Sequence, residues 1–169
     1  MHTGRKNSIK GRIHRDVNIT GSPQLTLETG GTDAVVDYAD GTGSTELTFN
    51  YTIADGHNIS DLDYTGTDAL DLNGGSINDA SGNAASLTLA TPGATNSLGD
   101  NRTLVIDGVV PTITTVTSTL NGTHKLGDVI PITITFDDNV TVTGTPQLTL
   151  AIGSPNVVVD YAEGTGTTI

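Results

Sequence analysis

The 169-residue sequence contains no cysteine, no tryptophan and, beyond its first 15 residues, almost no basic side chains. The absence of cysteine excludes a disulfide framework. Hydrophobic residues make up 34% of the chain and aromatic residues only 4%. No apolar run approaches the roughly 20 residues of a membrane span or the length of a signal peptide. We therefore expect no membrane insertion, and an exported protein would carry its signal elsewhere in a longer chain.

Charge is distributed unevenly along the chain. Five of the seven basic residues lie in the first 15 positions, at Arg5, Lys6, Lys10, Arg12 and Arg15. From Asp16 onward, 19 acidic residues stand against only Arg102 and Lys125, a net charge of −17. So acidic a body is expected to repel nucleic acid and anionic membranes and to attract cations. We interpret residues 1–16 as a basic, disordered leader or a remnant of cloning, because they show neither aromatic residues nor a repeated pattern.

Glycine, threonine, asparagine and aspartate take the place of the scarce apolar residues. This composition is typical of short strands joined by many turns. Low hydrophobicity with high net charge could also indicate disorder, but a regular alternation of apolar and polar residues argues against it. In "TELTFNYTI" (45–53) the residues predicted to face inward are Leu47, Phe49, Tyr51 and Ile53.

One segment of the chain occurs twice. Residues 17–46 align without a gap with residues 140–169 at an offset of 123 residues, and 18 of the 30 aligned pairs are identical. The identical pairs include turn glycines, such as Gly41 and Gly164, and strand residues, such as Val36 and Val159. Because solenoid repeats have periods of about 20 to 50 residues, a period of this length indicates tandem domains.

The strands can be followed through one period of the repeat. The predicted strands are residues 111–118, 129–136, 146–151, 156–161 (matching 33–38), 45–53, 86–90 and 102–108. No stretch shows a 3.6-residue period over three turns, so no helix longer than a single turn is expected. About seven short strands separated by turns predict an all-β fold of the β-sandwich type.

Several motifs of the chain resemble the tandem bacterial immunoglobulin-like repeats of very large surface proteins and adhesins. In order they are "GD" opening a strand, "VTGTPQLTL", "GTGSTELTFNYT", "DLDY", "INDASGN" and "DGVVPTI". The resemblance covers everything after the basic head. It implies an immunoglobulin-like β-sandwich, an extracellular or cell-surface location, and a stalk role, rigidified by calcium in some members, that carries a distal binding domain.

The resemblance also implies domain boundaries. A complete unit would begin near Val109, so residues 17–108 are expected to be a repeat that lacks its first two strands, and residues 109–169 the truncated start of the next. The chain would then be a stretch of a longer array, with neighbouring repeats as its partners. The missing strands would leave apolar faces and strand edges open.

Three arrangements of the strands at 111–136 stay open. In the first, these strands fold back onto the first unit. In the second, they pair with another chain, and in the third, the strand edges of the first unit stay unpaired. Because Pro111 and its neighbours favour an extended backbone, we expect an extended junction at 107–111 and self-association through the open edges.

Acidic turns are the candidate metal site, because calcium takes about 6 to 8 oxygen ligands. The candidate calcium ligands are Asp61, Asp63, Asp107, Asp137 and Asp138. Residues 61–72 superficially resemble a calcium-binding helix-loop-helix, but the twelfth position is Leu72 and no flanking helices are predicted. The alternative is that these carboxylates are solvated turn acids that accept hydrogen bonds from backbone N–H groups.

"DASGN" (79–83) is predicted to be a turn rather than a ligand set. Asp79 is expected to accept hydrogen bonds from backbone N–H groups, and Gly82 to take a positive φ.

Neither His57 nor His124 has a serine or carboxylate placed to suggest a catalytic triad, and no hydrolase motif occurs. We therefore predict a non-enzymatic stalk repeat of a large bacterial cell-surface or secreted adhesin-like protein. A carbohydrate- or surface-binding β-sandwich module is the alternative. Its weakness is that Phe49, Tyr51 and Phe136 are predicted to face the core, which leaves few aromatic residues for a sugar platform.

Overall fold

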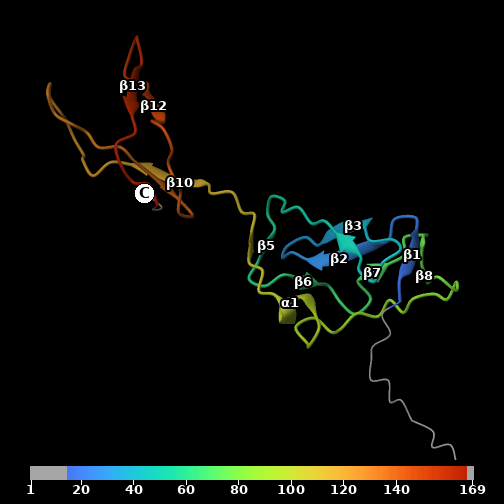
Figure 1. Ribbon diagram of the computed structural model, residues 1–169. Helices are drawn as coiled ribbons and strands as arrows, with labels where there is room; N and C mark the ends of the chain where they lie inside the picture. The colour runs from blue at the N-terminus through green and yellow to red at the C-terminus, as the bar shows by residue number, and fades with distance from the viewer. Residues whose placement is uncertain (1–14, 167–169) are drawn as a thin grey trace, which may run out of the picture. The chain divides into compact units, whose positions relative to one another are not determined.

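The computed structural model describes residues 15–166, which fold almost entirely as β-structure (Figure 1). Most of the expected leader, residues 1–14, lies outside the described residues. The chain divides into two compact units, the first ending at Val109 and the second beginning at Val110. The described residues contain one helix, α1 (Leu98–Asn101), which is a single turn, so the prediction of an all-β chain is confirmed.

Short strands make up the first unit. They are β1 (Val17–Thr20), β2 (Gln24–Glu28), β3 (Ala34–Asp40), β4 (Thr48–Phe49), β5 (Asn58–Ile59), β6 (Asp63–Tyr64), β7 (Leu70–Asp71), β8 (Ser76–Asp79) and β9 (Ile106–Asp107). Every pairing among them is antiparallel. Two small sheets, β1 with β8 and β5 with β9, accompany a five-stranded sheet.

Strand β2 lies at the centre of the five-stranded sheet. On one side it pairs with β3, and on the other side with β6 at Leu27 and with β7 at Leu25. Between β6 and β7, Thr26 donates its N–H to the carbonyl of Ala69 (3.0 Å) and accepts from the N–H of Thr65 (3.1 Å). Both edges of β2 are therefore hydrogen-bonded, and Figure 1 shows β2 and β3 side by side.

The core of the first unit forms on one face of this sheet. Period-two alternation turns Leu27 and Val36 to the same face, where they are 4% and 8% exposed. The buried residues that close over them are Leu62, Tyr64, Ala69 and Ile106. Burying a side chain of this size stabilises a fold by about 1.5–3 kcal/mol, so these few residues dominate the stability of the unit.

The second unit consists of two hairpins. Its strands are β10 (Ile113–Thr117), β11 (Thr133–Phe136), β12 (Gln147–Leu150) and β13 (Val157–Asp160). β10 pairs with β11, and β12 pairs with β13, both antiparallel. In contrast to the first unit, every residue from 110 to 166 is at least partly exposed.

Residues 45–53 form a shorter strand than predicted. Only β4 is regular, because the hydroxyl of Ser44 donates to the carbonyls of Gly41 and Glu46 (both 2.8 Å) and holds the preceding chain in a turn. Leu47, Phe49 and Tyr51 are half-buried, as predicted. Ile53, in contrast, is 49% exposed, so its predicted inward orientation is wrong.

Residues 86–90 form no regular strand, contrary to the prediction. Leu89 donates its N–H to the carbonyl of Thr67 (2.9 Å), but this is a single contact and not a ladder. Alternation selects which side chains face inward, whereas a strand also needs a neighbouring edge along its whole length.

Candidate functional site

The duplicated segments form the same hydrogen bonds in both units. Tyr38 donates its N–H to the carbonyl of Pro23 (2.7 Å), and 123 residues later Tyr161 donates to Pro146 (2.9 Å). The register also recurs, because Leu25 pairs with Val36 in β2–β3 just as Leu148 pairs with Val159 in β12–β13.

Side chains and turns recur with the backbone. The amide of Gln24 donates to Asp37 (2.9 Å), and the amide of Gln147 donates to Asp160 (2.8 Å). The φ angles of Gly41 and Gly164 are 116° and 117°, values that disfavour any residue with a Cβ. The identities between the two segments therefore preserve a detailed local structure.

Asp61 and Asp63, two residues apart in the sequence, are the two candidate calcium ligands that both lie close to Gly99 of α1. A Cβ placed on Gly99 of α1 would lie 3.0 Å from Oδ2 of Asp63 and 3.3 Å from Oδ2 of Asp61. Asp61 is exposed and accepts from the N–H of Leu104 (3.2 Å), whereas Asp63 is only 8% exposed.

The buried carboxylate of Asp63 is surrounded by hydrogen-bond donors. It accepts from the N–H groups of Tyr64 (2.9 Å), Gly93 (2.9 Å) and Gly99 (3.2 Å). Burial alone would raise the pKa of Asp63, but these N–H groups and the hydroxyl of Ser97 outweigh it, so the pKa is lowered. The negatively charged carboxylate of Asp63 thus connects β6 to the start of α1 through a hydrogen bond.

The other three candidate ligands lie elsewhere. Asp107 ends β9 and accepts from the N–H of Val109 (3.2 Å). In the second unit, Asp137 accepts from the hydroxyl and from the N–H of Thr112, at 2.6 and 2.7 Å, and these bonds lower its pKa. Asp138 accepts from the N–H of Asn139 (2.6 Å). Each of these carboxylates thus accepts from a backbone N–H group, which is one or two residues away for Asp138 and Asp107 and 25 residues away for Asp137.

The described residues bring together only part of a calcium ligand set. Within residues 15–166, no three acidic or histidine side chains converge where a metal ion could sit. The carboxylate oxygens of Asp63 already accept from N–H groups, and Asp61 with Asp63 would supply only part of the roughly 6 to 8 oxygens that calcium takes. Calcium binding therefore stays a prediction for which this structure offers a partial ligand set.

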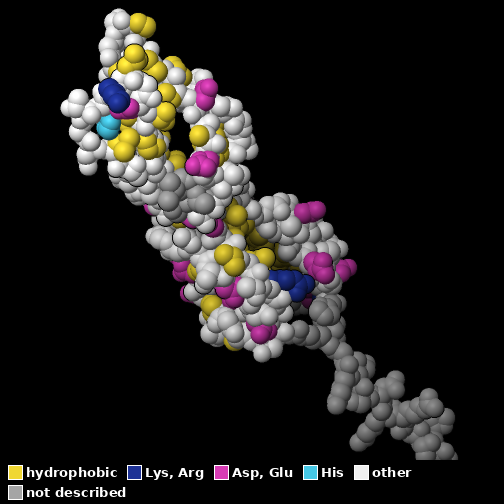
Figure 2. All heavy atoms as spheres, turned by 90° about the vertical axis from the view of Figure 1, so that its left-hand side faces the viewer, with side chains coloured by type: hydrophobic (Ala, Val, Ile, Leu, Met, Phe, Trp, Pro, Cys, Tyr) yellow, Lys and Arg dark blue, Asp and Glu magenta, His cyan; other side chains and the backbone are white. Residues whose placement is uncertain are grey.

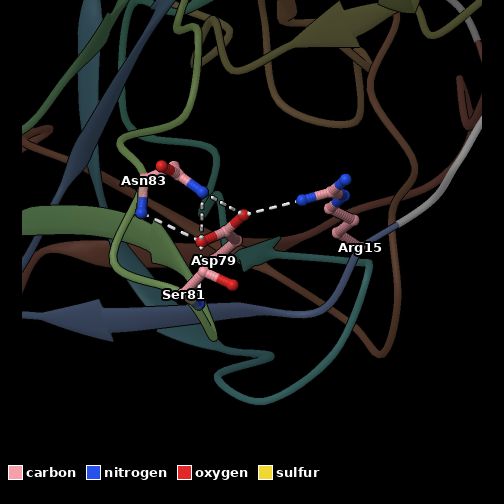
Figure 3. Close-up of polar contacts among 4 residues, drawn as sticks. All are labelled: Arg15, Asp79, Ser81 and Asn83. Carbon is pink, nitrogen blue, oxygen red and sulfur yellow. Dashed lines mark hydrogen bonds and ion pairs between the residues drawn. The ribbon is translucent and has the colours of Figure 1, made fainter.

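Asp79 forms the predicted turn, shown in Figure 3. Its Oδ1 accepts from the N–H groups of Ser81 and Asn83 (both 2.9 Å), and Gly82 has a φ of 84°. The side-chain amide of Asn83 does most to lower the pKa of Asp79, and together with the N–H groups of Asn83 and Ser81 and with Arg15 it brings that pKa to about 2. Arg15, which was expected to belong to the leader, forms an exposed ion pair with Asp79 at 3.1 Å.

The aromatic side chains are engaged in packing. All six of them are buried or half-buried. The hydroxyl of Tyr64 donates to the carbonyl of Ala90 (2.7 Å), and the rings of Tyr51 and His57 stack at 5.7 Å, with the Tyr51 hydroxyl 2.7 Å from Nδ1 of His57. His57 therefore has a structural role beside Tyr51, and a flat aromatic platform for a sugar is not formed.

Apolar side chains of the second unit line a hollow of about 800 Å³. Figure 2 shows hydrophobic side chains gathered around this opening in the unit that contains His124 and Lys125. The lining includes Ile132, Ile134, Leu148, Leu150 and Val159.

This hollow was not predicted from the sequence. The duplication predicts that the apolar residues of β12 and β13 line a core face, as the matching residues of β2 and β3 do in the first unit. The residues that cover the matching positions of the first unit come from 62–69, far from β2 and β3 in the sequence, so no local pattern indicates whether β12 and β13 are covered.

No family model, no curated protein and no solved structure matches the chain. Among the described residues, no helix has the length and apolar character needed to cross a bilayer.

Proposed function

We propose that the chain belongs to a tandem array of immunoglobulin-like β-sandwich repeats and serves as a non-enzymatic structural stalk in a large bacterial cell-surface or secreted adhesin-like protein. The observation that carries the proposal is the recurrence of the same hydrogen bonds, register and turn geometry at a spacing of 123 residues. Duplicated local structure supports a modular array, in which each unit contacts its neighbours along the chain.

The described surface supports a structural role over a binding one. All six aromatic side chains are buried or half-buried, Asp63 is bonded to Gly93, and Asp79 is bonded to Arg15, so both carboxylates join separate segments of the first unit. A carbohydrate- or surface-binding module remains the second candidate, and its contacts would then be polar rather than aromatic stacking.

Two measurements test the proposal. The coding sequence on either side of Met1 and Ile169 is expected to contain further copies of the repeat and an export signal. Antibodies raised against the chain are expected to label the surface of intact cells of the source organism. A flanking sequence without further copies, together with labelling only after cell lysis, would refute the stalk role. Saturable binding of the chain to a glycan array would favour the second candidate.

Calcium is proposed as a stiffening ligand of the acidic turns, because bound cations would relieve the repulsion within a body of net charge −17. Calcium at about 100 times its dissociation constant is expected to add about 2.7 kcal/mol of stability, and chelator to reverse it. Thermal unfolding with calcium, with sodium at equal ionic strength and with chelator measures this effect. A melting midpoint that is the same in all three contradicts calcium binding.

Self-association through open strand edges is a further part of the proposal. In the second unit Val129, Ile152 and Val158 are 85%, 71% and 53% exposed. Exposed apolar side chains next to an unpaired edge favour contact between copies of a chain.

A further inference from the structure

The tripeptide Leu-Asn-Gly occurs twice in the chain, with its asparagine at Asn73 and at Asn121. An asparagine before a glycine is chemically reactive, because glycine has no Cβ and its backbone nitrogen can approach the side-chain carbonyl of the asparagine closely. A five-membered ring then closes, provided that the two groups can rotate into contact. Since the neighbouring residues are the same at both sites, the surrounding structure decides which asparagine reacts.

The site at Asn73 is held in one conformation. Asn73 and Gly74 have φ angles of 46° and 75°, and a backbone hydrogen bond of 2.7 Å closes a turn around them. The N–H of Asn73 donates to the carboxylate of Asp71 (2.6 Å), and its side-chain amide donates to the carbonyl of Ser22 (3.2 Å). Rotation of Asn73 into contact with the nitrogen of Gly74 would break these hydrogen bonds.

The site at Asn121 has no such restraint. It lies in the loop 118–132, which joins the paired strands β10 and β11, and both Asn121 and Gly122 are exposed. Within residues 15–166, neither the side chain of Asn121 nor the N–H of Gly122 has a hydrogen-bond partner. The preceding hydrogen bond in the loop is that of the Leu120 N–H to the hydroxyl of Ser118 (3.2 Å), which does not involve the reacting groups. Asn121 can therefore rotate at little cost.

Aspartate before glycine can close the same ring with loss of water, and the chain contains three such pairs, Asp40–Gly41, Asp55–Gly56 and Asp107–Gly108. In all three the N–H of the glycine is already bonded. Gly41 donates to the carboxylate of Asp40 (2.8 Å), and Gly56 and Gly108 donate to backbone carbonyls (3.0 and 2.7 Å). Among these pairs of the described chain, Asn121–Gly122 is thus the one in which both the attacked side chain and the attacking N–H are unbonded.

We propose that Asn121–Gly122 is a site of spontaneous deamidation in the folded chain. The backbone nitrogen of Gly122 attacks Cγ of Asn121, and its proton passes through water to the side-chain nitrogen, which leaves as ammonia. Water then opens the succinimide ring at either carbonyl and yields aspartate or isoaspartate, without oxidation or reduction. Either product adds one negative charge to a body of net charge −17. This inference does not depend on the stalk role.

Peptide mapping by mass spectrometry tests the proposal on the full chain incubated in mildly alkaline buffer. We expect conversion of the amide to the acid at Asn121 to be at least about tenfold faster than at Asn73, with both isoaspartate and aspartate as products. In concentrated urea, which removes the restraints on Asn73, the two rates should agree within about twofold. Gly122→Ala is expected to slow the reaction at Asn121 at least about tenfold, because a Cβ hinders the approach of the nitrogen, and to leave Asn73 unchanged.

Several results would overturn the proposal. One is an equal rate at the two asparagines in the folded chain, and another is a reaction at Asn121 that occurs only in urea. A third is aspartate as the sole product, which would show direct hydrolysis by water instead of attack by Gly122. The comparison of Asn121 with Asn73 uses the unmodified chain, so the test does not depend on whether Gly122→Ala alters the loop.

Discussion

At the scale of single residues, the carboxylate of Asp63 joins three segments of the first unit. It accepts from Gly93 and Gly99, which lie 30 and 36 residues further along the chain, and from the adjacent Tyr64. The hydroxyl of Ser97 bonds to Asp63 and accepts from the N–H of Asp100 (3.1 Å), so this fully buried serine links the carboxylate to the first turn of α1. The acidic character of the position thus has a structural explanation.

Asp63→Ala is expected to destabilise the first unit by about 3 kcal/mol, because it leaves buried N–H groups without an acceptor. Urea unfolding followed by circular dichroism measures the loss. Asp55→Ala, at an exposed turn, is the matched control and should change stability by less than about 0.5 kcal/mol. Equal effects of the two substitutions would show that the Asp63 carboxylate does not hold these segments together.

The lowered pKa of Asp79 makes the free energy of unfolding depend on pH, and the sign of that dependence follows from the direction of the shift. Its pKa of about 2 in the folded chain lies below the roughly 3.9 of an unfolded aspartate, so its stabilising effect is complete above the unfolded pKa and is lost as pH falls through the folded pKa. The stability difference between the wild type and Asp79→Asn should therefore narrow from about pH 5 to about pH 2. Acid relieves charge repulsion in both proteins, so this general effect cancels when their free energies of unfolding in urea are subtracted. A difference that stays constant over this range would contradict the shifted pKa.

At the scale of elements, the turn before β4 depends on Gly41. The φ of Gly41 is 116°, and a Cβ there would collide with the carbonyl oxygen of Glu46, whereas Gly43 (φ 73°) has open space around it. Gly43→Ala is expected to cost about 1 kcal/mol, and Gly41→Ala clearly more, about 2 to 3 kcal/mol. Urea unfolding of the two variants provides the comparison, and equal losses would show that the collision is relieved without cost.

Local patterns in the sequence predicted local structure well. Alternation located β10 to β13, because the choice of inward face depends only on neighbouring residues. The turn at Asp79 was predictable because Asp79 bonds residues two and four positions away. The immunoglobulin-like arrangement and the array stay proposals, since they depend on how these elements pack.

Contacts between distant residues could not be predicted in the same way. Nothing near Asp63 in the sequence indicates that Gly93 and Gly99 are its hydrogen-bond partners. Leu27 and Leu150 occupy equivalent positions in identical "PQLTL" segments, yet only Leu27 is covered, because its cover comes from residues 62–69. The environment of a strand therefore depends on segments that its own sequence does not specify.

At the scale of the whole molecule, the two units offer a matched comparison of burial. The amides of Tyr38 and Tyr161 form the same hydrogen bond, but only the hairpin of Tyr38 belongs to a covered sheet. We expect the Tyr38 amide to exchange with solvent roughly tenfold more slowly or better, because local opening is easier where few apolar contacts must break. Hydrogen exchange by NMR measures both amides in one sample. Equal protection would show that the second unit is stabilised by something other than core burial.

The near-identity of β2 and β12 has a consequence for folding, because the segment that contains β6 and β7 could pair with either strand while the chain folds. Thr67, in the middle of this segment, is 41 residues from Thr26 and 82 residues from Thr149. Doubling a loop costs only about 0.6 kcal/mol of closure entropy, so proximity along the chain discriminates weakly between the two pairings. Selection of the correct partner must come from positions at which the copies differ. One is Thr29, which is fully buried and donates its hydroxyl to the carbonyl of Thr32 (2.5 Å), where the second copy has Ile152 and no hydroxyl. In a chain of repeats, such differences protect each unit from pairing with its neighbour's strands.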